Sequence, residues 1–174
     1  MKKNPLIVIT NDDGITAPGI KTLIEVVKKI TNRIVVVAPD KPQSGMGHAI
    51  TINAMIRIKE FDMDGITAYS CSGTPVDCVK VATTKIAEGK PDLIVSGINH
   101  GSNSSINVIY SGTMSAALEG SIEGIPSIGF SLDDTRIDAN FEATKKYVDQ
   151  IIRYTLDHQL EVNCCLNVNF PAIA

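Results

Sequence analysis

Short apolar runs alternate along the chain with stretches in which apolar residues recur every three or four positions. Uninterrupted apolar runs are typical of strands buried on both faces of a parallel sheet, and the wider spacing is typical of amphipathic helices. The pattern therefore predicts an α/β fold, with a mostly parallel sheet covered by helices on both faces. Strands are expected at residues 6–9, 34–37, 93–95, 126–130 and 166–170, and helices at 20–30, 74–89, 111–124 and 141–154.

Two of these helices have clear start signals. Thr74-Pro75-Val76-Asp77 combines a capping hydroxyl, a proline in the first turn and a carboxylate three residues after the cap. Ser111 is the expected cap of the following helix, which Gly124 ends. Residues 50–70 depart from the alternation, because two apolar-rich segments flank Asp64-Gly65. This departure predicts an inserted β-hairpin.

The length and composition narrow the class of protein. The chain has 174 residues, which suits a single domain spanning 1–174, and its 44% hydrophobic and 20% charged residues exclude disorder. The net charge of −3 argues against binding to a nucleic acid polymer, and no apolar stretch is long enough to cross a membrane. The four cysteines form neither a Cys-x-x-Cys pair nor a zinc pattern, so we expect reduced cysteines in a cytoplasmic protein.

Polar residues follow three of the predicted buried strands, at the edge where an open α/β sheet binds its ligands. The first of these segments contains Asp12 and Asp13. Neighbouring carboxylates repel each other and lose solvation when they are buried, and a divalent cation removes both costs. The alternative is that Asn-Asp-Asp-Gly is only a turn with capping carboxylates.

The other two segments supply neutral oxygen atoms. Ser44 follows the second predicted strand, and Asn99 follows the third. An all-oxygen site with two carboxylates suits Mg²⁺ or Mn²⁺ better than Zn²⁺. The same segments hold His48 and His100, each of which is either an acid or base of the site or an ordinary exposed histidine.

A second candidate feature is backbone that could bind an anion. Ser111-Gly112-Thr113 opens a predicted helix, and the free N–H groups of a helix start can hold a phosphate. Asn103 and Tyr110 could donate further hydrogen bonds to phosphate oxygens. The alternative is that Ser111 only caps its helix and that the polar residues before it form a solvated loop.

Five motifs follow one another along the chain and carry a family resemblance. They are Thr10-Asn11-Asp12-Asp13-Gly14 with Ala17-Pro18-Gly19, Val37-Ala38-Pro39-Asp40 with Ser44-Gly45, Ser72-Gly73-Thr74-Pro75-Val76-Asp77-Cys78-Val79, Ser96-Gly97-Ile98-Asn99 with Gly101 and Asn103, and Tyr110-Ser111-Gly112-Thr113 with Ala116-Ala117 and Glu119-Gly120. Through these motifs the chain resembles the survival protein SurE family of metal-dependent 5′/3′-nucleotidases. The resemblance covers nearly the whole chain.

The resemblance implies a Rossmann-like three-layer α/β/α fold and the hydrolysis of nucleoside 5′- and 3′-monophosphates. It also implies one divalent cation per subunit, Mg²⁺ or Mn²⁺, held by the positions that match Asp12, Asp13, Ser44 and Asn99. A homodimer or homotetramer is implied as well, formed partly through a C-terminal extension that family members carry and this sequence does not contain.

The expected mechanism is attack by a metal-activated water on the phosphate. Asp12 or Asp13 would orient this water. Because phosphoryl transfer depends mostly on positioning and electrostatics, few reactive side chains are needed. The remaining phosphate oxygens would be held by Asn103, Ser111, Gly112 and Thr113.

Two other classes of protein also place acidic residues after a first strand. A haloacid-dehalogenase-like phosphatase uses a nucleophilic aspartate two residues before a second aspartate, and here Asn11 holds that position before Asp13. A phosphoacceptor receiver domain of signalling proteins needs an aspartate after the third strand, where this chain has Asn99. Both remain alternatives to the nucleotidase at this point.

Overall fold

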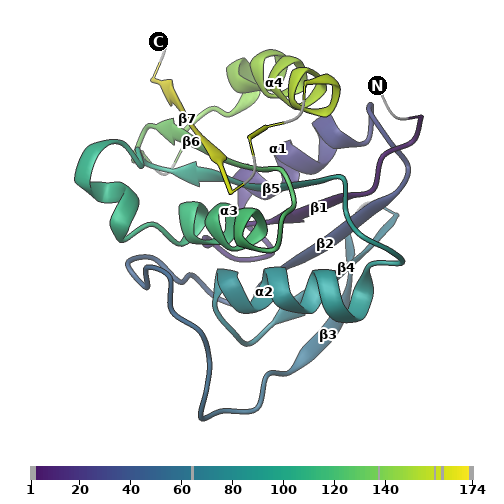
Figure 1. Cartoon of the computed structure of the whole chain (residues 1–174). Helices are drawn as coiled ribbons and strands as arrows, with labels where there is room; N and C mark the ends of the chain where they lie inside the picture. The colour runs from purple at the N-terminus through teal and green to yellow at the C-terminus, as the bar shows by residue number, and fades with distance from the viewer. Residues whose placement is uncertain (1–2, 64, 137, 159, 162, 173–174) are drawn as a thin grey trace.

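The structure is a computed structural model that describes residues 3–63, 65–136, 138–158, 160–161 and 163–172. Within this part of the chain, seven strands form one sheet in the order β3-β4-β2-β1-β5-β6-β7 (Figure 1). Every neighbouring pair is parallel except β3 and β4. The strands are β1 (Ile7–Thr10), β2 (Ile34–Pro39), β3 (Ile58–Met63), β4 (Ile66–Cys71), β5 (Leu93–His100), β6 (Ser127–Asp133) and β7 (Cys165–Pro171).

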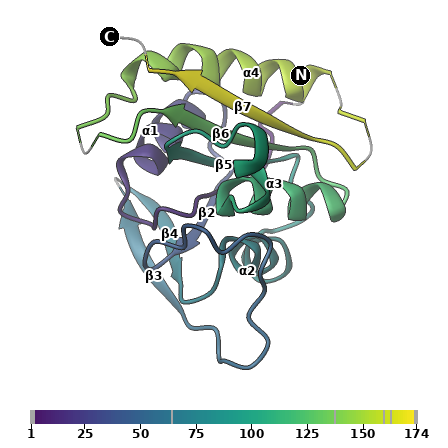
Figure 2. The ribbon, with the colours of Figure 1, turned by 90° about the vertical axis from the view of Figure 1, so that its left-hand side faces the viewer.

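Helices cover both faces of the sheet (Figure 2). On one face α1 (Pro18–Val27) packs against α4 (Lys145–Asp157), and on the other α2 (Pro75–Val81) packs against α3 (Gly112–Ile122). Alternate side chains of β1 enter different cores: Ile7 and Ile9 pack with α1 and α4, and Val8 packs with α2 and α3. The three-layer α/β/α fold is therefore confirmed. The short helical turns are η1 (Ala82–Ile86), η2 (Ser105–Ile109) and η3 (Glu142–Thr144).

The predicted hairpin is formed by β3 and β4, and it belongs to the main sheet. The two strands pair in antiparallel register, and β4 also pairs in parallel with β2. Because β4 occupies a central position, β3 becomes an edge strand of the sheet. Asp64, which we placed in the turn of this hairpin, lies outside the described residues.

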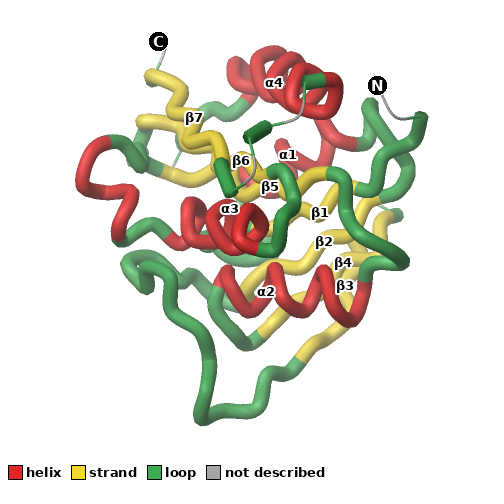
Figure 3. Tube along the Cα trace, in the orientation of Figure 1, coloured by secondary structure: helices red, strands yellow, loops and turns green. Residues whose placement is uncertain are grey.

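The first part of the predicted hairpin, however, is not a strand. Residues 40–57 form a long connection, called here the β2–β3 loop, which Figure 3 shows between those two strands. Ile52, expected in the hairpin, has 78% of its surface exposed. On its antiparallel side, β4 uses all six of its residues to pair with Ile58–Met63, so it offers no partner to the residues before Ile58.

One predicted helix and one predicted strand end at other residues in the structure. The helix expected to reach Gly89 leaves α-helical geometry after Val81 and continues as η1, where the hydroxyls of Thr83 and Thr84 bond to backbone carbonyls one turn earlier. The strand expected at 93–95 continues to His100, with a register shift against β6 between Ser96 and Asn99. Asn99 thus lies on the end of a strand and not in a loop. Among the described residues, none of the helices has the length and apolar character needed to span a bilayer.

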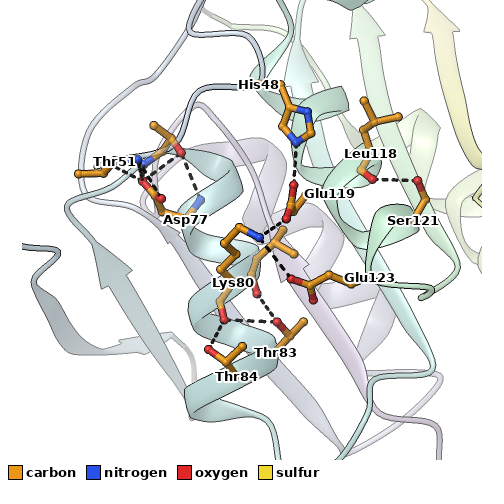
Figure 4. Close-up of polar contacts among 12 residues, drawn as sticks. His48, Thr51, Asp77, Lys80, Thr83, Thr84, Leu118, Glu119, Ser121 and Glu123 are labelled. Carbon is orange, nitrogen blue, oxygen red and sulfur yellow. Dashed lines mark hydrogen bonds and ion pairs between the residues drawn. The ribbon is translucent and has the colours of Figure 1, made fainter. Parts of the chain in front are cut away.

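Asp77 stabilises the start of α2 and ties the β2–β3 loop to it. Its carboxylate accepts a hydrogen bond from the Thr74 backbone N–H at 2.9 Å, which completes the predicted capping box. The same carboxylate accepts from the hydroxyl of Thr51 at 2.6 Å (Figure 4). Burial raises the pKa of Asp77, but the hydrogen bonds from Thr51 and Thr74 outweigh that effect and hold this pKa below its usual 3.8.

We predict that Asp77→Ala destabilises the protein by about 2 kcal/mol at neutral pH, because a helix cap and charge-assisted hydrogen bonds are lost together. The lowered pKa means that this stabilisation is complete above pH 3.8 and disappears as pH falls through the folded-state pKa. Urea unfolding of both proteins at pH 7 and near pH 3 measures the difference. An equal difference at the two pH values would contradict the assigned role of the carboxylate.

Candidate metal and phosphate site

Asp12 lies directly after β1 and is held by the first turn of α3. Only 4% of its surface is exposed. The Thr113 hydroxyl donates a hydrogen bond to Asp12 Oδ1. A Cβ atom at Gly112 would lie 2.6 Å from Asp12 Cβ, so this position accepts only glycine without displacing the aspartate. The helix start and the carboxylate are therefore in direct contact.

The surroundings of Asp12 disfavour its negative charge. Burial raises its pKa to about 6, the hydrogen bond from Thr113 opposes this rise, and the charge of Asp13 adds to it. A cation beside the two carboxylates would favour their ionised forms. The electrostatics of Asp12 thus agree with a metal ligand.

Asp13 is linked to the end of β5. Its Oδ2 accepts a hydrogen bond from the backbone N–H of His100 at 3.2 Å. Burial raises the pKa of Asp13, and the hydrogen bond and the charge of His100 act against this rise. The contact brings Asp13 next to Asn99, whose amide nitrogen donates to the Gly101 carbonyl at 2.6 Å. That bond leaves the amide oxygen of Asn99 as the atom able to bind a cation.

Ser44 reaches the same edge of the sheet through the start of the β2–β3 loop. The backbone N–H of Gln43 donates to the Asp12 carbonyl at 2.8 Å, and the N–H of Ile15 donates to the Pro39 carbonyl at 2.9 Å. These bonds hold the segments after β1 and β2 side by side, and Ser44 itself is exposed. The structure therefore brings Asp12, Asp13, Ser44 and Asn99 to one rim from three separate segments.

The residues expected to bind phosphate have other contacts in the structure. The Ser111 hydroxyl accepts from the Met114 N–H at 3.0 Å, which is the capping role named as its alternative. Thr113 directs its hydroxyl at Asp12. Asn103 is buried, and its amide nitrogen donates to the Ser131 hydroxyl at 2.9 Å. Tyr110 is exposed and makes no side-chain hydrogen bond within the described chain.

The residues present fit a hard divalent cation. Two carboxylates, one hydroxyl and one amide oxygen are the donor atoms that Mg²⁺ and Mn²⁺ prefer. Beside them, the buried side-chain oxygen of Asn11 has no hydrogen-bond partner within the described chain, and buried polar atoms of this kind are normally satisfied by water or an ion. The described residues contain no group of three or more His, Cys, Asp or Glu side chains suited to a metal, so this mixed oxygen set is the candidate site.

The two histidines of the candidate segments are both engaged by other groups. His48 Nε2 lies 2.8 Å from a carboxylate oxygen of Glu119, and His100 Nε2 contacts the Arg136 carbonyl. Sequence reasoning identified neither the contact between Thr113 and Asp12 nor the close approach of Gly112. No local pattern signals these contacts, because residues 101 positions apart meet only after the sheet and α3 have packed.

Comparisons with known proteins identify the family and support the fold. The family model for survival protein SurE matches residues 7–174. The 5′-nucleotidase SurE of Christiangramia forsetii is 60% identical over 99% of this chain and 67% of its own length, and that of Flavobacterium johnsoniae is 61% identical over the same shares. The crystal structure of the SurE protein from Aquifex aeolicus has a TM-score of 0.88 at 40% identity and covers 97% of this chain and 67% of its own.

The chain thus spans about two thirds of the length of the curated relatives that it matches. Their similarity covers all the segments that meet at the rim, from the end of β1 to the start of α3. Because the family model matches residues 7–174 and the relatives align with nearly all of this chain, the chain belongs to the survival protein SurE family.

Proposed function

We propose that this protein is a divalent-metal-dependent phosphomonoester hydrolase that acts on nucleoside 5′- and 3′-monophosphates. Two findings support the proposal. The curated relatives at 60–61% identity are named 5′-nucleotidase SurE. The rim of the sheet combines a carboxylate pair with the start of a helix, which suits a cation and a phosphate together.

The observation that carries this proposal is the placement of Asp12 and Asp13. Both follow β1, both have raised pKa values because of burial, and each is held by a different element. Asp12 contacts Thr113 of α3, and Asp13 accepts from the backbone at the end of β5. Two carboxylates kept together at such a cost are better explained by a bound cation than by a turn.

The proposed cation is one Mg²⁺ or Mn²⁺ per subunit, bound by Asp12, Asp13, Ser44 and Asn99. When bound, such an ion stabilises charge on the phosphoryl group and lowers the pKa of water. The residues of this chain supply the geometry. Asp12 is fixed by α3, and Asp13, which is less buried, faces the rim and is the better placed to orient water and accept its proton.

The substrate phosphate would lie against the start of α3. Backbone N–H groups at this end of an 11-residue helix carry partial positive charge, and Ser111, Gly112 and Thr113 provide them. Asn103 is held by Ser131, the residue of β6 that pairs with Asn99, and by the side-chain oxygen of Asn169, which accepts from the Asn103 backbone N–H at 2.8 Å. We assign Asn103, Ser111, Gly112 and Thr113 to phosphate binding.

The two alternative classes lack their reactive group at this rim. Asn11 stands where a haloacid-dehalogenase-like phosphatase needs its nucleophile. Asn99, the penultimate residue of β5, stands where a receiver domain needs its phosphoacceptor. We further propose a cytoplasmic location, in line with four free cysteines, and a homodimer or homotetramer as the assembly.

A phosphate-release screen tests the proposed function. We expect the full chain to release phosphate from nucleoside monophosphates when Mg²⁺ or Mn²⁺ is present, and to lose this activity with excess EDTA because the carboxylate pair then lacks its cation. Restoring the metal should restore the rate. Activity that is unchanged by the chelator, or no release from any phosphomonoester, would contradict the proposal.

Asp13→Asn should lower kcat for p-nitrophenyl phosphate by more than about 100-fold, since loss of even an outer-shell partner of a metal costs about 10–100-fold. The fold should persist, because asparagine has the shape of aspartate and removes a charge that burial disfavours. Steady-state kinetics measure the rate, and thermal unfolding without metal verifies the fold. A variant with near-native turnover would refute the role of this carboxylate.

Gly112→Ala should lower kcat about 100-fold, because its Cβ would lie 2.6 Å from Asp12 Cβ and must displace that ligand. Leu118→Ala on the exposed side of the same helix is the matched control and should retain the native rate. Wild-type kinetics from Gly112→Ala would show that Asp12 does not require this contact.

A further inference from the structure

Glu119 is a buried carboxylate on α3 that takes no part in the proposed chemistry. Only 6% of its surface is exposed, and its two oxygens face two different segments (Figure 4). Oε2 lies 2.8 Å from His48 Nε2, which belongs to the β2–β3 loop. Oε1 is bonded by the Lys80 ammonium group of α2. A buried carboxylate with a partner from a long loop fixes that loop to its helix.

The part of the β2–β3 loop that contains Ser44 has few other restraints. Gly45 and Gly47 both have positive φ angles, +76° and +54°, which glycine adopts freely. A Cβ atom at Gly45 would meet nothing within 4 Å. Such a segment has high conformational entropy unless its two ends are held.

The two ends of this segment are in fact held. Before Ser44, the Gln43 N–H donates to the Asp12 carbonyl at 2.8 Å. After it, the Gly47 N–H donates to the Tyr110 carbonyl at 3.2 Å, and His48 then reaches Glu119. In the segment that follows Ser44, this histidine provides the first side-chain anchor.

The contact of His48 is made to α3, the same helix that holds Asp12. Thr113 and Glu119 both lie on α3, six residues apart, which is about 9 Å along a helix axis. Thr113 fixes Asp12 at one end of this distance, and Glu119 fixes the loop of Ser44 at the other. A rigid helix with both contacts sets the separation of two proposed ligands that come from different loops.

We propose that His48 and Glu119 are positioning residues, which hold the Ser44 loop in register with Asp12 so that the rim is preorganised for its divalent cation. This inference rests on the proposed function for the identity of the site. The acceptor in this pair, the Glu119 carboxylate, is buried. A hydrogen bond to a carboxylate that is shielded from water is stronger than the same bond at the surface.

Lys80 provides an internal control, because it binds the other oxygen of the same carboxylate. Its side chain is 47% exposed, and within the described part of the chain its ion pairs are with Glu119 and Glu123, neither of which belongs to the β2–β3 loop. Glu123 lies 3.8 Å from the same ammonium group. If Glu119 has a purely structural role, loss of its contact with His48 and loss of its contact with Lys80 should have equivalent effects. If it has a positioning role, only loss of the His48 contact should affect how Ser44 is held.

The test compares His48→Ala with His48→Gln and Lys80→Met in the full chain. Electron paramagnetic resonance titration without substrate measures the Mn²⁺ dissociation constant, which His48→Ala should raise about tenfold. His48→Gln, whose amide can still donate to Glu119, should restore the affinity to within about threefold, and Lys80→Met should leave it unchanged. Hydrogen exchange of residues 43–47 should be faster in His48→Ala alone.

Kinetics give a second signature of positioning. At limiting Mn²⁺, His48→Ala should lose about tenfold in kcat, and saturating Mn²⁺ should recover most of this loss while KM for p-nitrophenyl phosphate stays within about twofold. Glu119→Gln repeats the measurement from the other side of the pair. Native Mn²⁺ affinity and native exchange at 43–47 in His48→Ala would overturn the inference, as would equal effects of His48→Ala and Lys80→Met.

These readouts separate the two proposals. A wild-type chain that binds Mn²⁺ but hydrolyses no phosphomonoester would overturn the proposed function, while the affinity and exchange data still decide the role of His48. A wild-type chain that binds no Mn²⁺ would overturn the inference together with the metal site. A native rate at every Mn²⁺ concentration in His48→Ala would overturn the inference and leave the proposed function in place.

Discussion

The site depends on keeping two adjacent carboxylates together in a place where burial disfavours both charges. Asp12 and Asp13 follow the central strand β1, so neither can move far without disturbing the sheet. Each has its own restraint, from Thr113 for the first and from the backbone of His100 for the second. The segments that would bind substrate are arranged around this fixed pair.

Much of this arrangement can be predicted from the sequence, because it follows from local patterns. Apolar runs located the five parallel strands that the pattern predicted, and a capping hydroxyl with a carboxylate three residues later located the start of α2. The rule that ligands bind at the carboxyl ends of parallel strands then predicts that Asp12, Ser44 and Asn99 lie at one edge of the sheet. These inferences need only the order of elements and the chemistry of side chains.

The rest could not be predicted because it depends on tertiary packing. Gly112 and Thr113 were interpreted as phosphate-binding backbone, and their contact with Asp12 appears only when α3 packs on the sheet. The apolar spacing around Ile52 suggested a strand, but a strand also requires a free partner, and β4 has none to offer there. The spacing of apolar residues indicates which secondary structure a segment favours, but tertiary packing determines whether a strand is available to pair with it.

The charged residues of β3 bear on how this protein avoids aggregation. As an edge strand it exposes unpaired backbone groups, to which a strand of another molecule could add. Five of its six residues are exposed, and Lys59, Glu60 and Asp62 are among them. Charged side chains on an edge strand disfavour the addition of a further strand. The charged outer strand of the hairpin therefore makes this edge of the sheet a poor template for strand addition.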